Sequence, residues 1–167
     1  MKTLIPFLLA SCLIVSGCGS PTLDEGIRAL QSAYDGGSYE MVLKDAPGLL
    51  EQAGLDPSGD TASAWKIQKI RLLSLGKLGK GDEAAEVLAG LTPVYPDKIK
   101  AQLYAQIGGF VMDTGNYSEA VTVLDAGAKA FVSKKATFDP LIKSCTERAK
   151  AAGDNSALDA LKSLGYL

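Results

Sequence analysis

Cysteine is the residue type best suited to covalent chemistry in this 167-residue sequence, which contains three cysteines and no histidine. A thiolate is a strong nucleophile, whereas a serine hydroxyl needs a neighbouring base. The absence of histidine excludes Ser-His and Cys-His pairs, histidine general bases and histidine metal ligands. The candidates for covalent chemistry are therefore the thiols of Cys12, Cys18 and Cys145.

The residues before Cys18 have the layout of a processing signal. Lys2 precedes an almost wholly apolar run, Leu4 to Val15, which is too short for a membrane-spanning helix of roughly 20 residues. A short basic start, a short apolar core and small residues at the exit are typical of a secretory signal peptide. The last four residues, Val15-Ser16-Gly17-Cys18, resemble the lipobox of bacterial lipoproteins.

The lipobox resemblance implies cleavage after Gly17, a diacylglyceryl thioether on Cys18, and acylation of the new amino group by a palmitate-like chain. Two or three acyl chains hold a protein stably at a membrane. Gly19 stands where aspartate commonly retains such proteins in the inner membrane, which favours the periplasmic side of the outer membrane in a Gram-negative cell. The alternatives are an ordinary signal peptide and a buried N-terminal helix.

Removal of residues 1–17 leaves a lipidated cysteine with a short tether at 18–22 and one domain at 23–167. The formal net charge of −2 argues against a nucleic-acid binder, which would show a basic stripe. Since Cys18 carries lipid in this interpretation, Cys145 has no cysteine partner for an intramolecular disulfide. We expect its thiol to be buried and inert.

Residues 23–167 are predicted to be helical, because apolar residues recur at three- and four-residue spacing and no stretch alternates cleanly. The segment Thr22 to Glu25 predicts a capping box, and Asn116 and Asp139 are predicted to cap two further helices. Pro47 is expected to kink or break the second helix. Glycines and loops separate about eight helices in four hairpins, so the predicted fold class is all-α.

One hairpin, residues 102–132, has an ordered series of bulky and small positions. These are Tyr104, Ile107-Gly108, Val111, Gly115-Asn116-Tyr117, Glu119-Ala120, Leu124 and Gly127. The series resembles a tetratricopeptide repeat, in which small residues let paired helices approach closely. Glycines at positions 37, 79, 115 and 153 are 42, 36 and 38 residues apart, near that family's 34-residue period with loop insertions. The resemblance implies a right-handed superhelical array of about four antiparallel helix hairpins; a helical bundle without such stacking is the alternative.

Two segments partly match catalytic motifs, but neither indicates a catalytic site. Ser74 to Lys77 has the form S-x-x-K, but neither K-T-G nor S-D-N occurs in the chain. Gly79-Lys80 lacks the following Ser or Thr and the upstream glycine of a P-loop. We therefore expect no enzymatic site, no cofactor and no metal site.

The repeat resemblance also implies a groove that binds an extended peptide or a helix, built from the first helix of each hairpin. The family's groove positions fall on Lys66, Lys69, Leu73, Lys77, Gln102, Ala105, Gly109, Met112, Asp113, Lys143, Glu147 and Lys150. Basic residues outnumber acidic ones, so a ligand with acidic character or a free C-terminal carboxylate is expected. Alternatively, these lysines only solvate a helix face. Leu73 and Gly109 replace the asparagines of chaperone-binding members, which argues against that particular role.

Together these expectations describe a membrane-anchored adaptor or assembly factor of the bacterial cell envelope whose partner is a protein or peptide. Two alternatives stay open: an envelope enzyme with a site in the helical groove, and a structural surface lipoprotein without a dedicated peptide partner.

Replacement of Cys18 by serine tests the lipid anchor. We expect the Cys18→Ser chain to leave the membrane fraction for the soluble fraction, because a serine hydroxyl does not form the thioether. A Cys12→Ser chain is the matched control and should stay with the membranes. Membrane retention of Cys18→Ser equal to that of the wild type would rule out the anchor.

Overall fold

The computed structural model describes residues 22–52 and 62–167, so Cys18 and the predicted signal lie outside the described residues. The described part contains eight α-helices, one 3₁₀ segment and no strand. Their bounds are α1 Leu23–Asp35, α2 Tyr39–Gln52, α3 Ala62–Lys77, α4 Gly81–Leu91, α5 Ala101–Asp113, α6 Tyr117–Ala130, η1 Val132–Thr137, α7 Asp139–Ala152 and α8 Asn155–Ser163. The predicted all-α class is confirmed. None of these helices combines the length and the apolar character that a membrane span requires.

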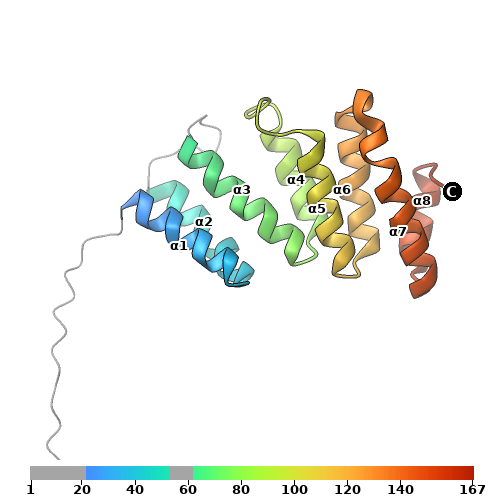
Figure 1. The fold of residues 1–167 in the computed structure, drawn as a ribbon, viewed down its shortest axis with the longest axis horizontal. Coiled ribbons are helices and arrows are strands. Elements are labelled where there is room, and N and C mark those ends of the chain that lie inside the picture. Colours follow the sequence, from blue (N-terminus) through green and yellow to red (C-terminus); the bar gives the residue numbers. More distant parts are fainter. Residues whose placement is uncertain (1–21, 53–61) are drawn as a thin grey trace, which may run out of the picture.

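The helices form two layers in an elongated row (Figure 1). Helices α1, α3, α5 and α7 follow one another in one layer, and each contacts the next. In the other layer α4 contacts α6, and α6 contacts α8. Helix α2 packs on α1 and α3, whereas its backbone does not come close to that of α4, and its Leu43 packs against the larger core. Helix α3 is therefore the main connection between the first hairpin and the rest.

Four turns that separate paired helices contain a glycine in the left-handed region. Gly37, Gly79, Gly115 and Gly153 have φ values from 69° to 87°. Other L-residues avoid this region because of their Cβ atom, so glycine is the residue that makes these turns without strain. Gly115, for example, follows the end of α5 at Asp113 in such a turn.

The predicted helix starts have different outcomes. Thr22 and Glu25 form the predicted capping box. Asn116 precedes α6, but its side chain makes no cap hydrogen bond there, so its predicted capping role is wrong. Asp139 is the first residue of α7, and Phe138 stands at the cap position. Helix α2 continues through Pro47 to Gln52, so of the expected kink or break, the break does not occur.

Asn116 and Glu119 instead connect neighbouring hairpins. The Asn116 side-chain amide donates to the carbonyl oxygen of Gly79 at 3.1 Å. The Glu119 carboxylate accepts from the backbone N–H groups of Gly81, at 2.5 Å, and Asp82, at 3.2 Å. These N–H groups lie in the first turn of α4, where Lys80 supplies no side-chain cap. The third hairpin thus caps a helix of the second.

Two hydrophobic cores meet at α3. The smaller core lies between α1, α2 and α3, and α3 contributes Ala64, Ile67 and Ile70 to it. The larger core extends from α3 to α8, and Leu72 and Leu75 belong to it. One helix therefore has to be buried on more than one side, which explains why its apolar residues are not confined to a single stripe.

Close packing requires a glycine at position 108 but not at position 109. A Cβ atom on Gly108 would lie 2.6 Å from Leu124 Cδ2, whereas one on Gly109 would meet no atom within 4 Å. We expect Gly108→Ala to lower the free energy of unfolding by about 1–3 kcal/mol, because overpacking forces neighbouring groups to move. Gly109→Ala should raise it by about 0.5–1 kcal/mol, because alanine favours the helix.

Urea denaturation of both variants measures this difference, and Gly109→Ala is the matched control because it makes the same change one residue away. Equal unfolding midpoints for the two variants would contradict the packing of α5 against α6.

Candidate functional site

Helix α3 places four predicted groove residues in one row. Lys66 and Lys69 are exposed, and Leu73 and Lys77 are half-buried. Their spacing of three or four residues puts them on one helix face. The rest of the helix is largely occupied by packing, since its buried residues are Ala64, Ile67, Gln68, Ile70, Leu72, Ser74, Leu75 and Gly76. The buried Ser74 hydroxyl is satisfied, because it donates to the carbonyl oxygen of Ile70 at 2.9 Å.

The row on α3 faces a hollow of about 530 Å³ that it shares with α1. The α1–α3 hollow is lined by Ile27, Arg28, Gln31, Tyr34, Lys66, Lys69, Ile70 and Leu73. All three charged side chains in this set are basic. Most of the remaining lining is apolar. Among the described residues, none of the ion pairs includes Arg28, Lys66 or Lys69.

Tyr34 is held in place at the edge of this hollow. Its ring centroid lies 5.5 Å from that of Tyr39 on α2, in a tilted arrangement. Burial raises the pKa of Tyr34, and the nearby Tyr39 and Asp35 raise it further. The phenol therefore stays protonated at neutral pH and keeps its O–H as a hydrogen-bond donor.

Two residues in the middle of the predicted groove, Lys77 and Asp113, already have partners within the chain. The Lys77 ammonium lies 3.7 Å from the centre of the Phe110 ring, which is a cation–π contact between α3 and α5. Asp113 pairs with Arg148 of α7 at 2.9 Å. Met112 is 5% exposed and packs in the larger core, so it does not join the surface residues.

The remaining predicted groove positions on α5 do not line the α1–α3 hollow, the hollow between α1 and α2, or the hollow at α7. Gln102 is exposed, and Ala105 and Gly109 are half-buried. The structure brings Lys143, Glu147 and Lys150 together at α7, where they line a second hollow of about 330 Å³. Asp139 and Glu147 balance the two lysines there, so this end offers mixed charge.

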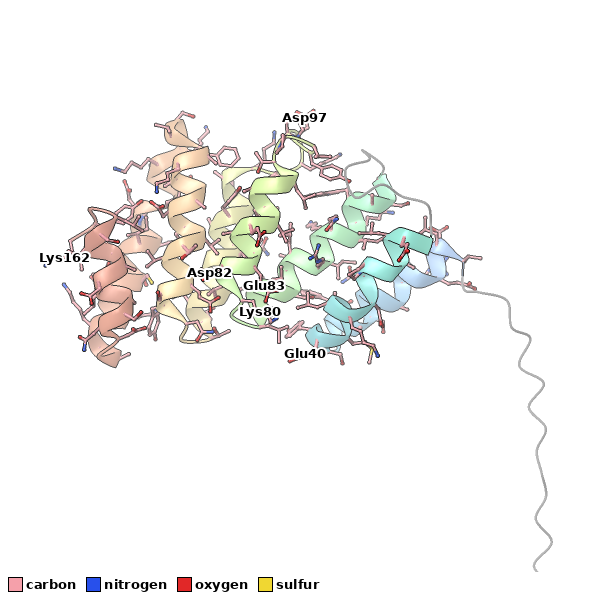
Figure 2. The ribbon with its side chains drawn as sticks, turned by 180° about the vertical axis from the view of Figure 1, so that it is seen from behind. Glu40, Lys80, Asp82, Glu83, Asp97 and Lys162 are labelled. Atoms are coloured by element: carbon pink, nitrogen blue, oxygen red, sulfur yellow. The ribbon has the colours of Figure 1, made fainter. Side chains whose placement is uncertain are left out.

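Charge differs sharply between the two layers near α3. Helix α3 carries Lys66, Lys69, Arg71 and Lys77 and no acidic residue. Helix α4, in the other layer, carries Asp82, Glu83 and Glu86 and no basic residue. Figure 2 shows this opposite face, where Asp82 and Glu83 lie at the start of α4 and Glu40 lies on α2. The basic side of the array is therefore the side with the α1–α3 hollow.

Sequence reasoning missed the contribution of α1 to the site. Ile27, Gln31 and Tyr34 follow one another at four- and three-residue spacing, and Arg28 stands beside them. The same spacing identified the row on α3, so it could have identified this row as well. The repeat pattern did not, because it is weak in the first hairpin.

Cys145, the described thiol, is enclosed by packing. It is 0% exposed, and its Sγ–H donates to the carbonyl oxygen of Tyr117 at 3.5 Å. Burial raises the pKa of the Cys145 thiol to about 11. The expectation of a buried thiol is confirmed. In the part of the chain that the structure describes, no three metal-ligating side chains of the His, Cys, Asp or Glu type gather in one place.

The chain matches no protein-family model, no curated protein and no solved structure. What the structure defines is an all-α protein of paired helices with a basic, partly apolar hollow at one end. The functional interpretation therefore depends on the residues of this chain.

Alkylation of Cys145 tests its environment. With a pKa of about 11, roughly one thiol in a thousand is ionised at pH 8. We expect iodoacetamide to label Cys145 more than about a hundredfold more slowly in the folded chain than in urea. Mass spectrometry of the peptide that contains residue 145 gives both rates. Similar rates in the two conditions would contradict the buried position.

Proposed function

We propose that this chain is a membrane-anchored adaptor or assembly factor of the bacterial cell envelope that binds a segment of a partner protein. The binding surface is the layer of α1, α3, α5 and α7, and the anchor is lipid on Cys18. The observation that carries the proposal is the row Lys66, Lys69 and Leu73, which presents cations beside apolar surface at the α1–α3 hollow. A concave, mostly apolar site with a few placed polar groups is typical of ligand binding.

The proposed architecture is a tetratricopeptide-like superhelix. Two observations support it: hairpins stacked side by side in two layers, and left-handed glycines that recur at 37, 79, 115 and 153. Stacking of this kind presents one continuous layer of first helices, which suits an extended ligand. The proposed anchor rests on the lipobox residues before Cys18.

Photo-crosslinking in cells tests the adaptor function. A crosslinking amino acid at exposed Lys69 or exposed Gln102 should capture the same partner protein, because both positions lie on the proposed binding layer. The same amino acid at Glu86, which is exposed on α4, is the control and should not capture that partner. Adducts that are absent, or equal at all three positions, would refute the proposal.

A further inference from the structure

The α1–α3 hollow combines cations from both of its bordering helices with an apolar lining. Arg28 belongs to α1, and Lys66 and Lys69 belong to α3, so cations come from both helices that border the hollow. Ile27, Ile70 and Leu73 supply its apolar lining; Ile70 is buried, and the other two are half-buried. An occupant that matches this arrangement has an apolar group between negative charges.

Two other hollows of the described chain are less selective. The hollow between α1 and α2, of about 410 Å³, is lined by Gly26, Ala29, Leu30, Met41, Asp45, Gly48 and Leu49 and has one charged residue. The hollow at α7 has lysines and carboxylates together. The first of these has only one charged side chain and the second has charges of both signs, so of the three hollows the α1–α3 hollow is the one for which electrostatic complementarity best identifies an occupant.

We propose that the α1–α3 hollow binds an extended peptide segment in which one bulky apolar side chain stands between acidic residues. The apolar side chain fills the space above Ile70 and Leu73, and the carboxylates lie against Arg28 on one side and Lys66 and Lys69 on the other. This inference rests on the proposed adaptor function and names the chemistry of its partner. The hollow volume of about 530 Å³ lies within the range of ordinary ligand sites.

The arrangement favours a peptide over a fatty acid or another single-headed amphiphile. Such a molecule carries a single anion, whereas the hollow is lined by three cations. An acidic peptide has carboxylates on both sides of its apolar residue. It also has a backbone that needs hydrogen-bond partners, which Tyr34 and Gln31 can supply.

These two side chains match the two kinds of backbone group. The neutral Tyr34 hydroxyl can donate to a peptide carbonyl. The Gln31 amide already donates to Asp35 at 2.9 Å, which leaves its carbonyl oxygen to accept from a peptide N–H. Asp35 thereby fixes the amide orientation that an incoming backbone requires.

Fluorescence anisotropy with synthetic peptides tests the inference on the full chain. The probe is a labelled peptide with one phenylalanine between two aspartates on each side. Binding should weaken with added salt, because the charges at the rim are exposed. Peptides with asparagine in place of aspartate, or alanine in place of phenylalanine, should each bind at least about fivefold more weakly.

Variants of the chain locate the contact. The double variant Lys66→Gln, Lys69→Gln should lose about fivefold to tenfold in affinity for the acidic probe, because two rim charges are removed from exposed positions. Lys44→Gln, the same kind of substitution at one exposed position of α2 outside the hollow, is the control and should bind as the wild type does.

Three results would overturn the inference: no binding of the acidic probe at about 1 mM, equal binding of the asparagine peptide, or unchanged binding by the double variant. Displacement of the probe by sodium laurate at equal concentration would also overturn it, because it assigns the hollow to a single-headed amphiphile. If any of these occurs while a crosslinker at Gln102 still captures a partner, the adaptor function stands and only the chemistry assigned to the hollow fails.

Discussion

The burial of α3 on more than one side is the constraint on which the rest of the structure depends. Ile67 and Ile70 face the small core of the first hairpin, and Leu72 and Leu75 face the large core of the others. A helix in this position has little surface left for charged groups, so Lys66 and Lys69 lie in a narrow exposed row. The burial of α3 therefore accounts for two features: the row of basic residues at the hollow, and the packing that connects the first hairpin to the others.

Contacts between hairpins set how the helices are spaced. Glu119 caps the start of α4, and Asn116 holds the carbonyl oxygen of Gly79 in the turn before it. At Gly81 a Cβ atom would collide with the backbone of Glu119, so a side chain there would push the hairpins apart. The capping of α4 and the close approach of the two hairpins thus occur at the same junction. Both depend on the glycines at positions 79 and 81.

Much of the fold could be predicted because it depends on local sequence. The partner of Thr22 in its capping box is three residues away. Each of the left-handed glycines in the turns lies within two residues of the end of a helix. The capping role of Glu119 could not be predicted, because its partner Gly81 is 38 positions away. Met112 illustrates the same limit for the site. Its spacing from Gly109 suits the groove, but the packing of α5 turns its side chain into the core.

The distance between the α2 and α4 backbones gives the first hairpin a weaker connection to the array than a central hairpin has. A unit with its own small core, held by α3 and by Leu43 of α2 against the larger core, opens at a lower free energy than a unit packed on two sides. The α1–α3 hollow lies on the seam between this hairpin and α3. An occupant that binds both helices stabilises the closed seam by mass action, so occupancy and the order of this hairpin are linked. The hairpin nearest the N-terminal segment is therefore the one whose order depends on whether the α1–α3 hollow is occupied.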